Sequence, residues 1–185
     1  MPYAKSRRDR EPSNATSETR PQRGEAAFRR RQSSNRLFVA CNPSAGVIFD
    51  SKGTLYGTTS SGGKLSFGRV FALKPPGPGK TKWNYSVLYG FGNGDDGDYP
   101  DANLILDQKG SLYGTTSGGG PLSGTVFKLS PTKTPPWKAT LLWAFGGRDD
   151  GNQPFGPVML HAGKLYGTTA YGGTYGEGTV FQVEP

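Results

Sequence analysis

The residues best suited to chemistry in this sequence are carboxylates in two loops that occupy equivalent places in an internal repeat. The first loop carries Asp95, Asp96 and Asp98, and the second carries only two carboxylates, Asp149 and Asp150. Calcium takes about six to eight oxygen ligands, so these side chains have suitable chemistry for a calcium site. Asp-Gly pairs are also common in tight turns, and the spacing is not that of an EF-hand. We therefore interpret both loops as turns and predict no bound metal.

Nucleophilic and zinc chemistry are limited by the supply of histidine and cysteine. The sequence has one histidine, His161, and one cysteine, Cys41. These do not complete a Ser-His-Asp, Cys-His or zinc-ligand set, and His161 aligns with Asp50 and Asp107 at an expected strand end. A carboxylate pair acting on glycosides stays open, because carboxylates distant in sequence can meet in a fold. We predict a protein that is not an enzyme, with no catalytic residues and no cofactor.

Aromatic side chains recur at matching positions of the repeat and could stack on sugar rings. A position that is aromatic in several copies serves what each copy needs, which is packing within or between repeats. We therefore favour a packing role for these rings over a sugar-binding role. The rings are those of Trp83, Tyr85, Tyr89, Trp137 and Trp143, together with Tyr56, Tyr113 and Tyr166.

The chain begins with a basic tail. Residues 1–40 hold ten bases and four acids, for a net charge of +6, whereas residues 41–185 hold twelve bases and ten acids, for +2. The tail arginines could neutralise phosphates, but Tyr3 and Phe28 are the only aromatic stacking partners before residue 38. We therefore expect residues 1–41 to be a disordered, solvated tail, and we treat nucleic-acid binding through it as the weaker interpretation.

The elements that must position these residues are short strands in a tandem repeat. The tract Leu-Tyr-Gly-Thr-Thr occurs three times, at residues 55–59, 112–116 and 165–169. In the first copy, strands are expected at residues 47–50, 55–59, 69–73 and 83–91, and the third copy stops before its fourth strand. Four short antiparallel strands per repeat are typical of a propeller blade. We predict an all-β fold of about two and a half propeller-like repeats.

Glycines at fixed positions are expected to shape the strands and loops. Gly57, Gly114 and Gly167 follow the tyrosine of the tract, where a missing side chain permits a bulge or a close approach of backbone. Glycine pairs at 62–63, 118–119 and 172–173 permit positive φ angles in the next loop. No helix is expected after them, which disfavours a phosphate-binding role.

The succession LYGTT, GG and GTVF, with L.F and DG..P..L, resembles the GloVer tandem-repeat family over residues 42–185. The resemblance implies a propeller-like bacterial protein that is exported or surface-anchored, and it implies no defined activity. The glycine pair followed by an aromatic strand and then Trp83 or Trp137 also resembles kelch blades, more loosely.

The repeats are expected at residues 42–100, 101–154 and 155–185, the last one incomplete. Because the array starts in mid-loop and about two and a half blades cannot close a ring of four to eight, we expect a fragment of a longer array. Two alternatives stay open: copies associate through open blade edges, or the array remains open and unstable.

We predict a non-catalytic interaction module located outside the cell or at its surface, with an unknown protein or glycan ligand. The alternatives are a polysaccharide-binding or polysaccharide-active domain and, second, a nucleic-acid binder using its basic tail. The sequence shows no export signal and no run of about 18 apolar residues, so no membrane span is expected.

Overall fold

The computed structural model describes residues 42–92, 94–119, 123–146 and 148–185. Every described residue belongs to one compact unit of the chain. The tail that was predicted to be disordered, together with Cys41, lies outside the described residues.

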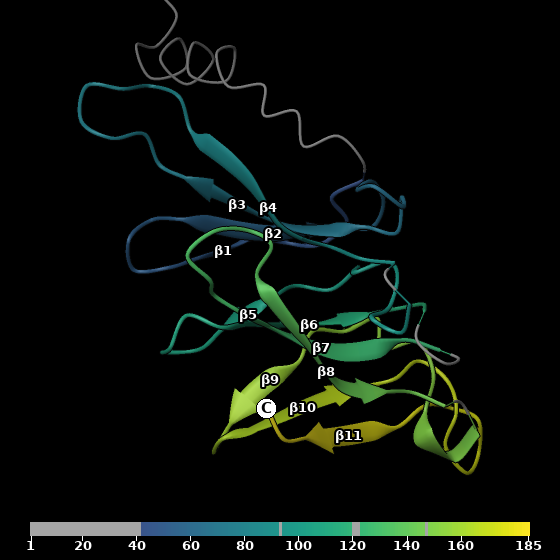
Figure 1. Ribbon diagram of the computed structural model, residues 1–185. Coiled ribbons are helices and arrows are strands. Elements are labelled where there is room, and N and C mark those ends of the chain that lie inside the picture. Colours follow the sequence, from purple (N-terminus) through teal and green to yellow (C-terminus); the bar gives the residue numbers. More distant parts are fainter. Residues whose placement is uncertain (1–41, 93, 120–122, 147) are drawn as a thin grey trace, which may run out of the picture. The chain divides into compact units, whose positions relative to one another are not determined.

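The described residues form three antiparallel sheets, one in each repeat (Figure 1). The first sheet contains β1 (Ile48–Phe49), β2 (Leu55–Thr59), β3 (Arg69–Lys74) and β4 (Asn84–Gly90), in that order. The second contains, also in order, β5 (Ile105–Leu106), β6 (Leu112–Thr116), β7 (Thr125–Ser130) and β8 (Lys138–Ala144). The third contains β9 (Met159–His161), β10 (Lys164–Thr168) and β11 (Val180–Val183).

The sheets confirm the predicted fold class. Each strand pairs with its neighbour in sequence, which is the meander expected from the four-segment repeat, and the third sheet ends at its third strand. The described residues contain no α-helix, and hence none that could cross a membrane, but include one 3-10 turn, η1 (Arg148–Asp150). The array is therefore all-β and propeller-like, and the described sheets do not close it.

Each Leu-Tyr-Gly-Thr-Thr strand uses its glycine to make room for an aromatic ring. Gly57 lies opposite Phe71, and Gly114 lies opposite Phe127. A Cβ atom added at Gly114 would lie 2.6 Å from Cζ of Phe127 and 3.0 Å from Cδ2 of Leu104. The prediction that the glycine permits a bulge or a close approach of backbone is wrong, because the group that approaches it is a phenylalanine side chain. The shifts in strand register lie elsewhere, between the third and fourth strands of the first two sheets.

The loop glycines follow the prediction in two of the three repeats. Gly62 and Gly63 have φ angles of 87° and 88°, and the equivalent pair at 172–173 is also positive. In the second repeat, Gly119 alone of the pair has a positive φ, of 70°. Positive φ is accessible to glycine without steric cost, so these residues let the chain reverse tightly after the second strand.

Two hydrophobic clusters join neighbouring sheets. Tyr56 of the first sheet and Phe127 of the second belong to one cluster, and Val126 of the second sheet and Leu165 of the third belong to the other. The middle sheet therefore packs on both faces, and its strand β6 is buried throughout, whereas β9 is exposed along its length. Each repeat completes part of the core of the next, as expected for stacked repeats.

Candidate functional site

The loops considered for calcium hold their carboxylates through hydrogen bonds to their own repeat. Asp96 accepts a hydrogen bond from the Tyr89 hydroxyl at 2.7 Å, and Asp150 accepts one from Nε1 of Trp143 at 3.1 Å. Each carboxylate also accepts a bond from the backbone amide four residues upstream. Within the described ranges, no group of three or more candidate ligands could hold a metal ion. These contacts favour the turn interpretation of both loops.

Asp98 forms part of a joint between the first and second repeats. Its backbone exchanges hydrogen bonds with that of Gly118, at 2.7 and 3.0 Å. Burial, followed by the nearby Asp96 carboxylate, raises the pKa of Asp98. The next acidic residue, Asp101, accepts hydrogen bonds from the hydroxyls of Ser44 and Ser117. The segment from Asp98 to Asp101 thus links the first and second repeats through hydrogen bonds.

Aspartates in the first two repeats clamp the tyrosine of the repeated tract. Asp50 accepts hydrogen bonds from two backbone amides of its turn and from the Tyr56 hydroxyl at 3.1 Å. Burial opposes ionisation of Asp50, but the hydrogen bonds outweigh it and hold its pKa below the ordinary value. Asp107 makes the same set of contacts. Burial and the hydrogen bond to Asp107 raise the pKa of Tyr113 to about 12.

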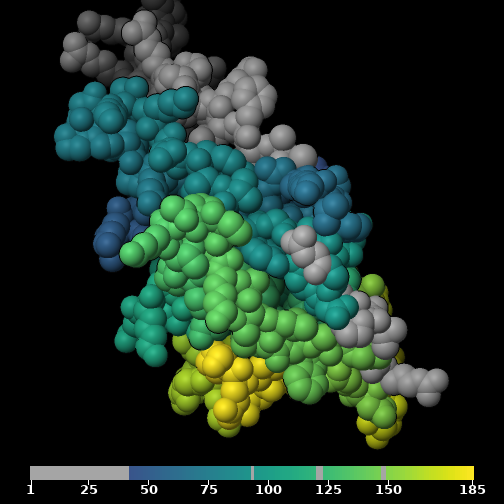
Figure 2. All heavy atoms as spheres, in the orientation of Figure 1, coloured from purple at the N-terminus to yellow at the C-terminus, as the bar shows by residue number. Residues whose placement is uncertain are grey.

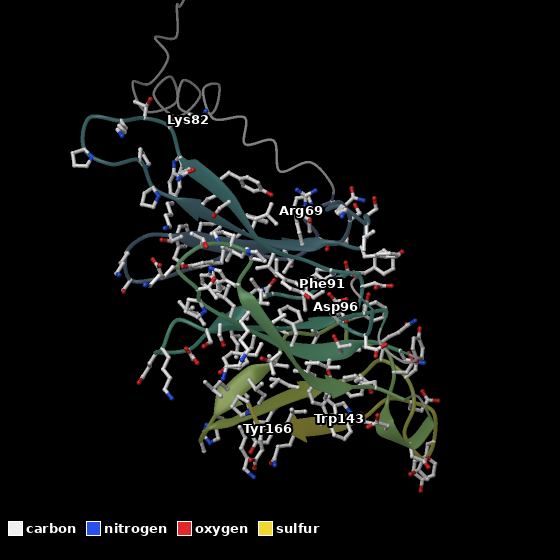
Figure 3. All side chains as sticks on the ribbon, viewed as in Figure 1. Arg69, Lys82, Phe91, Asp96, Trp143 and Tyr166 are labelled. Atoms are coloured by element: carbon white, nitrogen blue, oxygen red, sulfur yellow. The ribbon has the colours of Figure 1, made fainter. Side chains whose placement is uncertain are left out.

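The third repeat replaces this clamp with a tighter turn. His161 is exposed at the end of β9, before a turn, as the alignment predicts. It pairs with Lys164 across two residues, Ala162 and Gly163, with φ angles of 48° and 79°. The turn is too short to repeat the Asp-to-tyrosine geometry, and Tyr166 is half-buried there (Figure 3).

The remaining aromatic candidates differ in how far they are buried. Trp137 packs between repeats, with its ring centre 6.1 Å from that of Tyr56. Tyr89 packs edge-on against Phe91 at 5.2 Å. Trp143, which Figure 3 labels, is by contrast 46% exposed, although its indole nitrogen donates a hydrogen bond to Asp150. The half-buried rings are those of Trp83, Tyr85, Tyr89 and Trp137.

A groove lies where the first two repeats meet, at the end of the sheets that carries the β1–β2 turn. It consists of two hollows of about 220 and 540 Å³ that share the rings of Tyr56 and Trp137. The β1–β2 and β5–β6 turns line the larger hollow. We call the two hollows together the inter-repeat groove. The polar side chains that line its smaller hollow are those of Lys74, Asn84, Ser86, Thr132 and Lys133.

The loop between β7 and β8 forms one wall of this groove and is anchored to the first repeat. The backbone amide of Trp137 donates a hydrogen bond to the Leu88 carbonyl of β4 at 2.8 Å. Within the loop, the Thr132 hydroxyl donates to the carbonyls of Thr134 and Pro136, at 2.7 and 3.2 Å. Figure 2 shows this green segment lying against the blue-green atoms of the first repeat. The wall is therefore attached to β4 and stabilised by hydrogen bonds within the loop.

In the first two repeats, lysines predominate at one end of the strands and aspartates at the other, with Asp50 and Asp107 at the lysine end and Lys64 and Arg69 at the aspartate end. The meander brings the β1–β2 type turns and the β3–β4 type loops to one end, and the acidic loops to the other; Lys82 and Asp96 mark these ends in Figure 3. In the described residues a single ion pair occurs, between Lys164 and Glu184, so none neutralises a groove lysine. The first end in the first two repeats carries Lys52, Lys74, Lys80, Lys82, Lys109, Lys133 and Lys138. The other end carries Asp95, Asp96, Asp98, Asp101, Asp149 and Asp150.

No sequence motif marks the inter-repeat groove. Its walls come from strands of one repeat and a loop of the next, and no motif links residues such as Lys74 and Lys133. The available signal was the placement of lysines in both Pro/Lys loops, at 75–82 and 131–136. Those two loops differ in length and sequence, whereas the hydrogen-bonded Asp and Tyr pairs, Asp50 with Tyr56 and Asp107 with Tyr113, recur in the first two repeats.

Comparison with known proteins identifies a repeat family. No curated protein matches the chain. The family match starts upstream of residue 42, where the first repeat was expected to begin, and the looser kelch resemblance finds no support in it. The protein belongs to the Gloeobacter/Verrucomicrobia repeat family, whose model matches residues 18–185.

Proposed function

We propose that this protein is a non-catalytic interaction module that acts outside the cell or at its surface. One observation chiefly supports the proposal: the recurring polar groups hold turns and joints together, whereas one wall of the smaller hollow is the β7–β8 loop, which differs in length and sequence from the β3–β4 loop of the first repeat. Four carboxylates accept hydrogen bonds from side chains of their own repeat, namely those of Asp50, Asp96, Asp107 and Asp150. Variable loops on a rigid scaffold are a common place for binding residues.

Self-association is part of the same proposal. Of the described strands, β11 pairs with β10 alone, so its other edge offers backbone groups to a strand from another chain. Val180 on this strand is 81% exposed, which leaves apolar surface beside that edge. The molar mass of the purified chain, measured over a range of concentrations, tests this part; a constant monomer mass contradicts it.

A screen of the whole chain tests the proposed function. Immobilised glycans and surface proteins would be exposed to the chain, with glycan and peptide cleavage measured in the same samples. We expect saturable binding to at least one partner and no product. Saturable turnover would show an enzyme, and absence of binding across the panel would contradict an interaction role.

The location requires its own measurement. Antibody labelling of intact cells that express the protein from its natural gene is expected to detect it at the surface, or culture medium is expected to contain it. Detection in lysed cells alone would contradict the extracellular part of the proposal.

A further inference from the structure

We propose that the inter-repeat groove binds an acidic polysaccharide, with a sugar ring against Trp137 and an anionic group between Lys74 and Lys133. This inference rests on the proposed interaction function and names the class of ligand and its site. The shared chemistry is a pyranose that carries a carboxylate or a sulfate.

The aromatic floor of the groove is held in a fixed geometry. The rings of Tyr56 and Trp137 are tilted by 54° to each other, with centres 6.1 Å apart. The Tyr56 hydroxyl is bound by Asp50, and the Trp137 backbone is bound by Leu88. Preorganised rings reduce the entropy lost on binding. A half-buried tryptophan also offers an apolar ring surface that fits the C–H face of a sugar.

Hydroxyl and amide groups stand beside this floor. Asn84 and Ser86 on β4 and Thr132 on the β7–β8 loop line the smaller hollow. They supply donors and acceptors of the kind that sugar hydroxyls need. The volume of about 220 Å³ is suited to a small group such as one sugar unit of a chain.

The charge around the floor is positive. Lys74 and Lys133 are exposed, and no described ion pair involves them. Lys52 and Lys109 line the adjoining larger hollow. The ionised carboxylates of Asp50 and Asp107 also line that hollow, so four lysines stand against two aspartates in the lining of the two hollows together, which leaves it net positive. An anionic group is therefore attracted to the lysine side of the groove.

The same features favour an acidic sugar over a nucleic acid. The two rings are inclined, so they form no parallel slot for a flat base. Hydroxyl-rich surroundings and one sugar-sized hollow suit a glycan better.

The groove is not a general product of repeat geometry. In the second repeat, Lys128 takes the place of Ala72, and its Nζ atom lies 5.4 Å from the ring centre of Tyr113. Lys128 therefore covers the ring that is equivalent to Tyr56. Ser130 stands where the first repeat has Lys74. The site between the first two repeats thus depends on residues specific to that junction.

The test compares two lysine pairs with the same change of charge. The whole chain would be titrated calorimetrically with oligogalacturonate, sulfated dextran fragments, neutral dextran and a single-stranded DNA of similar length. We expect binding to one or both acidic glycans, which distinguishes carboxylate from sulfate, and none to neutral dextran. Lys74→Ala/Lys133→Ala is expected to weaken binding by about tenfold or more, through loss of charge-assisted contacts. Lys80→Ala/Lys82→Ala, outside the groove, should change it by about threefold or less.

Tryptophan emission gives a second readout for the site. Binding should change the emission of the wild-type chain, and Trp137→Phe should remove most of that change. Equal loss in both lysine pairs, or stronger groove-dependent binding of DNA, would overturn the inference. If no acidic glycan binds but the broad screen finds another partner, this inference fails and the interaction function stands; failure of both screens contradicts both.

Discussion

Replacing Gly114 by alanine should destabilise the protein by overpacking the junction between the first two repeats. The added Cβ would meet Cζ of Phe127 at 2.6 Å and Cδ2 of Leu104 at 3.0 Å, and both side chains are only 2% exposed. Neither can move without disturbing the shared core. Overpacking of this kind costs about 1–3 kcal/mol. The φ angle of Gly114 is not in the left-handed region, so steric contact is the cause that is tested.

Two glycines of the first sheet, Gly90 and Gly57, serve as controls. Gly90→Ala adds a methyl group with no atom within 4 Å and no unfavourable φ, so it should be neutral or stabilising by about 0.4–1 kcal/mol. Gly57→Ala should be intermediate, because its Cβ would meet Phe71 at 2.6 Å but its other close neighbour is Val47, which is 49% exposed and free to shift.

Chemical denaturation of the three variants, followed by tryptophan emission and checked by thermal unfolding, measures the order. A change of 1 kcal/mol should move the melting temperature of a domain of this size by about 2–4 °C. We expect Gly114→Ala to be the least stable, followed by Gly57→Ala and then Gly90→Ala. If Gly114→Ala is as stable as Gly90→Ala, the glycine is not a space for the facing ring and the reasoning is wrong.

Three further predictions concern the carboxylates. Asp50→Asn/Asp107→Asn should make stability depend less on pH in acid. The lowered pKa values of these two carboxyl groups contribute stability above about pH 4, and this stability is lost as the pH falls through their folded-state pKa values. The urea midpoint of the double variant should therefore fall less steeply from about pH 5 to about pH 2 than that of the wild type. Asp96→Ala should lower the free energy of unfolding in urea by about 1–3 kcal/mol, because it removes the acceptor of the hydrogen bonds from the Tyr89 hydroxyl and the Gly92 amide. Asp95→Ala, at an exposed neighbour, should change that free energy by about 0.5 kcal/mol or less. Equal effects of the two variants would contradict the structural role of Asp96. Adding millimolar calcium should leave the melting temperature unchanged, and a saturable rise would contradict the turn interpretation of the acidic loops.

The strands could be predicted because three copies of one pattern give three independent views of it. The Leu-Tyr-Gly-Thr-Thr strand, the preceding turn and the following aromatic strand all appear where the alignment puts them. Hairpins link neighbours in sequence, so local turn chemistry and hydrophobic pattern determine the pairing. The role of the tract glycines was missed because it depends on which way a Phe ring on the next strand points.

The inter-repeat groove could not be predicted for a related reason. Lys74 and Lys133 come from different repeats, and their proximity depends on how two sheets stack and where the β7–β8 loop folds. The tract tyrosines looked identical in sequence, yet Tyr56 lies in the groove, Tyr113 lies under Lys128, and Tyr166 has no Asp clamp. Neighbouring repeats, rather than the tract itself, decide what each tyrosine does.

The pairing of a glycine with a facing phenylalanine limits how the copies can diverge after duplication. Gly57 and Phe71, Gly114 and Phe127, and Gly167 and Phe181 each occupy opposed positions on adjacent strands. A larger residue at the glycine position is tolerated only after the phenylalanine has been replaced by a smaller residue. Replacing the phenylalanine first leaves a cavity until the glycine is replaced by a larger residue. Neither single step is neutral, so drift at one position is blocked by its partner. The two tracts therefore remain recognisable in every copy, while the loops between them are free to acquire separate roles.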